Sequence, residues 1–154
     1  MPRIAWAIAA ECRDIALLLV LTFGAVQSAA ERSEIMIVLN DRGGYVGARA
    51  LEIAQLNARE TKVELRGRVC YSSCTMYLGA DNLCISPQTT FGFHGPSRNG
   101  SSLPGRQFDH WSRVMAQHYA PPLRDWFMRE ARHRISGYYS ISGDQLISMG
   151  YPAC

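Results

Sequence analysis

The stretch EIMIVLNDRGGYVGARALEIAQLN, residues 34–57, indicates the fold class. Its first seven residues, 34–40, form a nearly continuous apolar run of strand length, which is typical of a strand buried in a parallel sheet. The turn signal DRGG at 41–44 ends that run. Residues 46–57 then place apolar side chains at the spacing of a helix. A strand, a glycine turn and a helix in this order predict an α/β protein.

The rest of the chain continues the alternation of short strands and helices. Apolar runs predict further strands at 62–65, 84–85 and 90–94. Helical spacing predicts helices at 70–79, 108–119, 123–134 and 145–149. Residues 95–105 are rich in Gly, Pro, Ser and Asn and are expected to form a loop. This order predicts a parallel sheet with helical cover in one domain, residues 31–154.

Composition excludes several classes of protein. The chain has 154 residues, of which 47% are hydrophobic and 19% are charged, and this composition fits one globular domain rather than a disordered chain. The formal net charge is only +3, and no run of five or six like charges occurs. We therefore expect no nucleic-acid partner.

The first thirty residues have the features of a signal peptide. The run IALLLVLTFGAV at 15–26 has the length of the apolar region of such a peptide and is too short for an ordinary membrane span. Small residues follow it, and cleavage after Ser28 or Ala30 leaves small residues where signal peptidase requires them. The expected location is periplasmic or secreted. The alternative is an uncleaved N-terminal anchor at 1–30, which is the only membrane contact that we expect.

Removal of residues 1–30 leaves four cysteines, Cys70, Cys74, Cys84 and Cys154. An even number in an exported chain favours disulfides, and four cysteines allow three pairings. We prefer the pair Cys84–Cys154, because the chain end needs tethering and Cys84 precedes an apolar strand. The spacing of Cys70 and Cys74 would suit zinc, but no matching Cys or His pair follows, so no metal is expected.

Two short segments contain residue types that can take part in catalysis. Gly43 and Gly44 follow a strand, and the bare N–H groups of such a turn can hold a developing oxyanion. Ser72 and Ser73 stand at the expected start of a helix, whose dipole stabilises negative charge, and a nearby His94 could accept a proton. Taken singly, each has a more common structural explanation: a plain turn for the glycines, a helix cap for the serines, and a structural role for the histidine.

Taken together and in order, the segments resemble the proteolytic subunit of Clp protease within the Clp/crotonase superfamily. The resemblance covers residues 34–94, with a strand, Gly-Gly and a helix, then a strand, a serine and a helix, and then Pro87 and His94. The ending DQLISMGY at 144–151 resembles the last helix of that family. A group of small exported Clp-like proteins with the patterns Cys-x-Ser-x-Cys, here 70–74, and Gly-Phe-His, here 92–94, is more similar still. The resemblance implies a reduced ββα superhelix of the Clp/crotonase type that lacks the first strand-helix unit.

The resemblance also implies roles for individual residues, without any cofactor. Ser72 matches the nucleophile, with Ser73 as the substitute if the helix starts one residue later. His94 matches the general base, and the amides of Gly43 and Gly44 match the oxyanion hole. The family's orienting carboxylate would fall near residues 137–139, which contain no acid. Asp144 is the nearest candidate in the sequence, and Asp125 is the next.

Two functions remain as alternatives. The first is an exported serine hydrolase that acts on a peptide or a small ester. The second is a non-catalytic Clp-like scaffold that binds a peptide or a partner subunit, and a homo-oligomer stays open in both. A Ser/Lys dyad is disfavoured, because Lys62 is the only lysine and lies about 25–30 Å from Ser72 along an extended path. The chain also lacks the basic nucleotide clamp that would bind acyl-coenzyme A.

Overall fold

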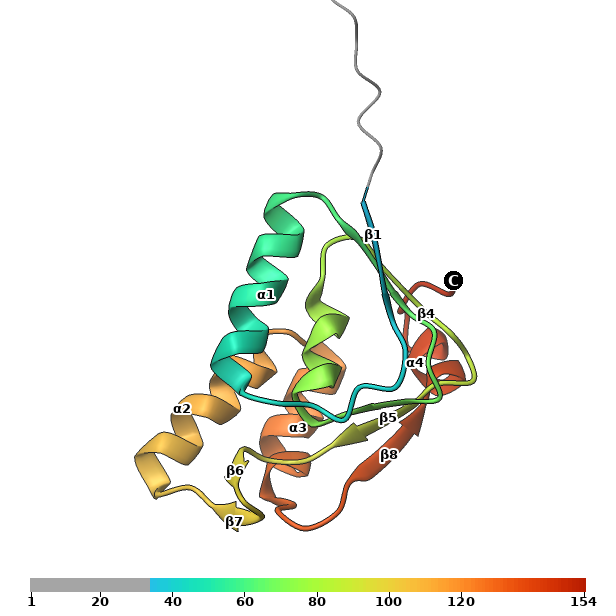
Figure 1. The fold of residues 1–154 in the computed structure, drawn as a ribbon. Coiled ribbons are helices and arrows are strands. Elements are labelled where there is room, and N and C mark those ends of the chain that lie inside the picture. Colours follow the sequence, from blue (N-terminus) through green and yellow to red (C-terminus); the bar gives the residue numbers. More distant parts are fainter. Residues whose placement is uncertain (1–33) are drawn as a thin grey trace, which may run out of the picture. The chain divides into compact units, whose positions relative to one another are not determined.

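The computed structural model describes residues 34–154, so the predicted signal peptide or anchor at 1–30 lies outside the described residues. Strands and helices alternate along the described chain, and the expected α/β class is confirmed (Figure 1). Within this part of the chain, no helix is long and apolar enough to cross a membrane.

The first sheet is entirely parallel, as the sequence predicted. It consists of β1 (Ile35–Val38), β2 (Lys62–Leu65) and β4 (Leu83–Ile85), in the order β1-β2-β4. The central strand β2 and its neighbour β4 are largely buried. The strand β1 differs from the prediction of a buried strand, because it lies at the edge of the sheet.

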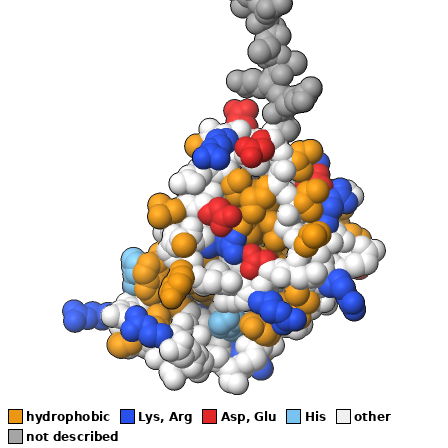
Figure 2. All heavy atoms as spheres, viewed as in Figure 1, with side chains coloured by type: hydrophobic (Ala, Val, Ile, Leu, Met, Phe, Trp, Pro, Cys, Tyr) orange, Lys and Arg blue, Asp and Glu red, His pale blue; other side chains and the backbone are white. Residues whose placement is uncertain are grey.

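The exposed face of β1 follows from its edge position. Ile35 and Ile37 are 54% and 55% exposed, whereas Val38 is buried in the core. In Figure 2, hydrophobic side chains gather on the surface where β1 runs in Figure 1. An unbroken apolar run therefore indicates a strand here, but does not tell whether both faces are covered.

The second sheet contains β3 (Val69–Tyr71), β5 (Thr90–Phe93) and β8 (Tyr139–Ser142), in the order β3-β5-β8. β5 runs parallel to β3 and antiparallel to β8. The expected single parallel sheet is therefore wrong. The chain leaves the first sheet sharply at Gly67, where an added Cβ would lie 1.7 Å from a backbone oxygen. Only glycine allows so close an approach.

A repeated order of elements results from this division into two sheets. The repeated unit is a strand of the first sheet, then a strand of the second sheet, then a helix. It first occurs in full as β2, β3 and the 3₁₀ helix η1 (Ser72–Gly79). The order returns as β4, β5 and, after a hairpin, α2 (Gly105–Ala116). A partial version precedes both, because Asp41 after β1 forms a parallel bridge with Cys70 before α1 (Val46–Ala58) begins.

The helices lie close to their predicted ranges. The remaining helical elements are α3 (Pro121–Arg129), the 3₁₀ turn η2 (Ala131–His133) and α4 (Gly143–Ser148). The segment predicted as a helix at 70–79 is a 3₁₀ helix that begins at Ser72. The pair Pro121-Pro122 forms the first turn of α3, where proline loses no hydrogen bond. The core between helices and sheets contains the fully buried side chains of Tyr77, Phe91, Phe93 and Phe127.

Residues 95–105, expected to be a loop, contain a small hairpin of β6 (Ser97–Arg98) and β7 (Ser101–Ser102). Asn99 and Gly100 connect the two strands with φ angles of 51° and 76°. Two positive φ angles in a two-residue Asn-Gly connection are typical of a type I′ turn, whose twist matches that of a hairpin. The hairpin lies beside the N-terminal end of α2 (Figure 1).

The four cysteines of residues 34–154 form two disulfides. Cys84 is bonded to Cys154, seventy residues later, which is the pairing preferred from the sequence. The C-terminal residues are also tied to β4 by backbone hydrogen bonds, since the Cys154 N–H donates to the Ile85 carbonyl at 3.0 Å. Cys70 is bonded to Cys74. The second bond encloses only a short turn, and that turn contains Ser72.

Candidate functional site

A cleft of about 640 Å³ brings together three of the residues singled out from the sequence, Gly44, Ser72 and His94. The start of α1 forms one side of the cleft, and the β6–β7 hairpin and α2 form the other. Its apolar lining includes Leu103, Trp111 and Met115. Arg98 is the only charged residue that lines it. The cleft thus joins a hydroxyl group, an imidazole and a backbone turn beside an apolar surface.

Ser72 occupies an unusual backbone position. It is the residue at which β3 ends and η1 begins, it is half-buried, and its φ angle is +58°. A residue other than glycine in this left-handed region costs on the order of 1–3 kcal/mol, and such strain is concentrated at functional sites. The disulfide between Cys70 and Cys74 spans this residue and restrains the turn on both sides. No pattern of residues around Ser72 indicates this strain.

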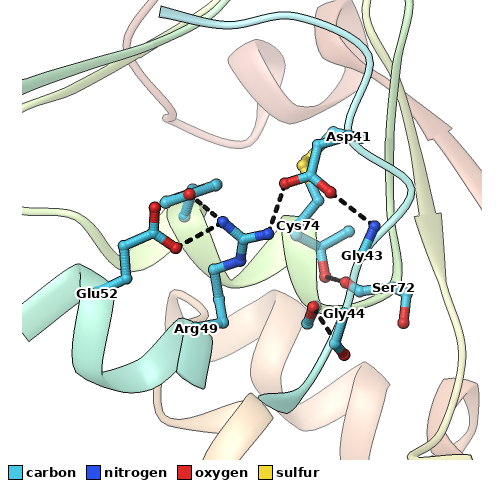
Figure 3. A network of polar contacts seen from close by, with 11 residues as sticks. Asp41, Gly43, Gly44, Arg49, Glu52, Ser72 and Cys74 are labelled. Carbon is cyan, nitrogen blue, oxygen red and sulfur yellow. Dashed lines mark hydrogen bonds and ion pairs between the residues drawn. A yellow bond between two sulfur atoms is a disulfide. The ribbon is translucent and has the colours of Figure 1, made fainter. Parts of the chain in front are cut away.

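Gly43 and Gly44 have different roles, although the sequence paired them. Gly43 has φ +95°, and a Cβ added to it would lie 2.5 Å from the Cβ of Ser72, so only glycine fits against the serine. Its N–H donates to the Asp41 carboxylate at 2.7 Å (Figure 3). Gly44, in contrast, lines the cleft. The expectation of two oxyanion donors from this turn therefore needs correction, because the amide of Gly43 already has a partner.

A partly buried ionic network holds this turn against α1 and η1. Arg49, whose side chain is only 12% exposed, donates to Asp41 at 2.6 Å and to Glu52 at 2.8 Å. It also donates to the Tyr77 hydroxyl and lies 4.3 Å over the ring of Tyr77. Burial raises the pKa of the Tyr77 hydroxyl well above its ordinary range. Sequence reasoning missed this network, because the residues that form it come from three separate elements.

Ser73 is not placed as a substitute nucleophile. Its side chain is fully buried, and its hydroxyl donates to the Gly44 carbonyl at 3.2 Å. The helix begins at Ser72, and the serine after it therefore points into the protein. Ser73 joins η1 to the glycine turn, and this contact fixes Gly44 beside Ser72.

His94 follows β5 directly and is half-buried in the cleft. Burial lowers the pKa of its imidazole below the ordinary value, while the adjacent Gly95 backbone opposes this in part. The imidazole is therefore neutral at pH 7, which is the form that accepts a proton. Its buried Nδ1 has no hydrogen-bond partner among residues 34–154. The ring of Tyr138 lies against it, with a centroid distance of 5.2 Å.

Within residues 34–154, neither of the two predicted aspartates lies beside His94. In the β5–β8 register Thr90 lies opposite Ser142 and Phe93 lies opposite Tyr139, so Asp144 follows the far end of the pair. The length of β5, about 13 Å for four residues, separates that end from His94. Asp125 pairs with Arg124 on α3 at 3.3 Å and does not line the cleft. Neither aspartate is therefore placed to orient the imidazole in this structure.

The described residues near the cleft support neither a Ser/Lys dyad nor a metal site. Lys62 pairs with Glu64 on β2 at 2.8 Å and does not line the cleft. Among the described residues, no three histidine, cysteine or acidic side chains gather as metal ligands would. Cys70 and Cys74, whose spacing suits zinc, are bonded to each other.

No protein-family model matches this chain, and no curated protein is significantly similar to it. The chemistry of the site must therefore be argued from its geometry. A strained serine, a half-buried histidine and the backbone of a glycine turn in one cleft are groups of the kind that acyl transfer uses.

Proposed function

We propose that the protein is an exported Clp-protease-like serine hydrolase that acts on peptide or ester bonds. One observation carries the proposal: a serine held at φ +58° lines the same cleft as a half-buried, neutral His94 and the backbone of Gly44. Strain at a serine is costly unless the position of its hydroxyl matters. In the proposed reaction, Ser72 is the nucleophile and His94 is the general base.

The reaction proceeds in two halves. The Ser72 oxygen attacks the substrate carbonyl carbon, and the neutral His94 imidazole accepts the hydroxyl proton. The N–H of Ser73 is a candidate donor to the oxyanion, because first-turn amides of a 3₁₀ helix have no partner within that helix. The N–H of Gly44, whose backbone lines the cleft, is the second candidate. The protonated His94 then gives its proton to the leaving group, and water hydrolyses the acyl-serine by the same route in reverse.

The order of elements supports the Clp/crotonase assignment. The repeated passage from the first sheet to the second sheet and into a helix agrees with a ββα superhelix. The two disulfides support export to an oxidising compartment, periplasmic or extracellular.

Because no described acidic residue orients His94, the expected rate of hydrolysis is low. A Ser-His pair with oxyanion donors but no acid keeps only part of the effect of a full triad. The ring of Tyr138 packs against the His94 imidazole, and it also stacks on the ring of Tyr71 at a centroid distance of 4.6 Å. The aromatic contact restricts the imidazole but does not stabilise its positive charge as a carboxylate would. We therefore expect slow turnover.

The unpartnered Nδ1 of His94 favours a second candidate, a non-catalytic Clp-like scaffold that binds a peptide. The apolar lining of the cleft would suit such a peptide as well as it suits a substrate. The two candidates differ in one respect: the scaffold binds without breaking a bond.

Turnover of activated esters and fluorogenic peptides by the purified, oxidised protein separates the two candidates. The variants are Ser72→Ala and His94→Ala, with Ser101→Ala as the control, because Ser101 is exposed in β7 and does not line the cleft. The hydrolase proposal predicts turnover by the wild type and by Ser101→Ala, and its loss in the other two variants. Peptide binding without turnover in the wild type would instead support the scaffold.

A further inference from the structure

A second cavity, of about 440 Å³, opens where α3 ends and the chain turns back toward β8. The residues that line it are Arg129, Glu130, His133, Arg134, Ile135, Ser136 and Tyr139, and none of them lines the cleft of Ser72. Two arginines and a histidine thus face one carboxylate. The cavity has a local excess of positive charge that the mild net charge of the whole chain does not suggest.

Arg134 is held in place without being neutralised. Its guanidinium group lies 4.1 Å over the ring of Tyr139, and its Nε is buried without a hydrogen-bond partner among residues 34–154. Neither Arg134 nor Arg129 forms an ion pair with any described residue. Arg134 is half-buried and Arg129 is exposed, and a buried N–H donor such as the Arg134 Nε costs free energy when it has no partner.

The neighbouring Arg132 shows what a structural arginine looks like in the same segment. It pairs with Asp109 at 2.9 Å and lies over the ring of Phe108 at 5.5 Å. Its charge is satisfied within the protein. Arg129 and Arg134 have no such partner in the described chain, and the planar guanidinium group matches the oxygens of carboxylates and phosphates in two parallel hydrogen bonds.

We propose that this cavity binds a small oxyanion, a phosphate or carboxylate group, with Arg134 as the main contact and Arg129 as the second. The stacked Tyr139 holds the Arg134 guanidinium ready for the ligand, so little side-chain entropy is lost on binding. This proposal is independent of the hydrolase proposal, because it uses none of the same residues.

The backbone links the anion site to the strand that carries His94. The Gly95 N–H donates to the Arg134 carbonyl at 2.9 Å, and Tyr139 pairs with Phe93 across the β5–β8 ladder. Both contacts fall on the residues directly before and after His94. Binding in the cavity is therefore expected to shift the backbone amide signals of Phe93 and Gly95 as well as that of Tyr139.

Titration of the oxidised protein with inorganic phosphate, followed by NMR, tests the proposal. Sodium chloride keeps the ionic strength constant, because screening would otherwise imitate a loss of affinity. We expect saturable shifts at Gly95 and Tyr139. We also expect an affinity about tenfold lower in Arg134→Gln, since a charge-assisted hydrogen bond is lost. Arg124→Gln is the control, because Arg124 lies on α3 outside the cavity.

Each result decides the proposal. Equal weakening by Arg124→Gln and Arg134→Gln, an adventitious ion only, or shifts that never saturate would overturn it. A parallel titration with acetate identifies the source of the oxyanion, and tighter binding of either anion supports the shared chemistry. Arg129→Gln, checked by circular dichroism, replaces Arg134→Gln if the latter does not fold. Hydrolysis is not measured in this experiment, so its outcome does not depend on that of the hydrolase proposal.

Discussion

At the scale of single residues, the φ angle of Ser72 has a measurable consequence for stability. Glycine adopts φ +58° without the steric penalty that a side chain causes, while alanine keeps the penalty. Ser72→Gly is therefore expected to be more stable than Ser72→Ala by about 1 kcal/mol, and neither variant should hydrolyse a substrate. Urea unfolding of the two variants measures the difference. An alanine variant as stable as the glycine variant would show that the position is not strained.

The lowered pKa of His94 determines how activity depends on pH. Because burial disfavours the charged imidazole, the active neutral form persists to a pH below the ordinary midpoint near 6.5. We expect kcat/KM to rise with pH through a midpoint below 6.5. For the same reason, the contribution of His94 to folding stability is lost as the pH falls, since the unfolded chain then binds the additional proton. A kinetic midpoint above 6.5 would contradict the burial of the base.

Asp41 is predicted to act as a positioning residue for the glycine turn. Its carboxylate accepts from the Gly43 amide and from Arg49, so Asp41→Ala leaves the Gly43 amide without its partner and removes one of the three partners of the Arg49 guanidinium. We expect kcat to fall about tenfold or more, with a smaller loss in Asp41→Asn, which keeps an acceptor for Gly43. Asp81→Ala, an exposed loop variant, is the control. Steady-state kinetics should show the loss mainly in kcat, and equal effects of Asp41→Ala and Asp81→Ala would refute the role.

The strand-turn order of the sequence predicts that Gly44, Ser72 and His94 meet at one edge of a parallel sheet. The three residues do line one cleft, but Gly44 follows a strand of the first sheet and the other two follow strands of the second, so the predicted reason for the grouping is wrong. The separate role of Gly43 could not be predicted. It depends on a side-chain hydrogen bond from Asp41, two residues away, and a Gly-Gly pair contains no sign of which amide is free. Asp144 was misplaced because the direction of β8 was unknown, and the antiparallel pairing carries it to the wrong end of β5.

At the scale of elements, periodicity identified helices and the longer strands but missed β3 and β8. β3 has only three residues, too few for a period to emerge, and β8 follows the Ser-Gly turn at 136–137 without an apolar run. The β6–β7 hairpin had a recognisable signal, the Asn-Gly pair, which was read as part of a loop. The passage between the two sheets depends on backbone contact at Gly67, and one sequence does not reveal such a contact.

The short disulfide that spans the start of η1 is expected to matter more for activity than for stability. Cys70 and Cys74 are four residues apart, and the chain-entropy model gives about 2 kcal/mol for so short a loop. Without the bond, Ser72 is free to leave its left-handed conformation. The double variant Cys70→Ala/Cys74→Ala should therefore retain its fold by circular dichroism and lose most of its hydrolysis. Full activity in this variant would show that the bond does not position the serine.

At the scale of the whole molecule, the second disulfide closes most of the described chain. A disulfide between residues 70 positions apart adds roughly 4 kcal/mol to the free energy of unfolding in the chain-entropy model. The double variant Cys84→Ala/Cys154→Ala should thus have a clearly lower midpoint in urea. Its folded fraction should keep its activity, because neither cysteine lines the cleft. A variant as stable as the wild type would argue against this cross-link in solution.

The cleft depends on the division of the chain into two sheets. Ser72 follows β3 and His94 follows β5, the paired strands of the second sheet, whereas Gly44 comes from the turn after β1 of the first sheet. The bridge between Asp41 and Cys70 brings the two sheets together at this point. The proposed chemistry therefore requires the whole described fold, and no single element contains it.

Labelling of the oxidised protein with a fluorophosphonate, followed by mass spectrometry of its peptides, tests the central claim most directly. An activated serine attacks the phosphorus atom and keeps the adduct, whereas a capping serine does not react. We expect one adduct, located on Ser72, which is absent in Ser72→Ala, much slower to form in His94→Ala, and unchanged in Ser101→Ala. No adduct on the folded wild-type protein, or an adduct that persists in Ser72→Ala, would contradict the assignment of Ser72 as the nucleophile.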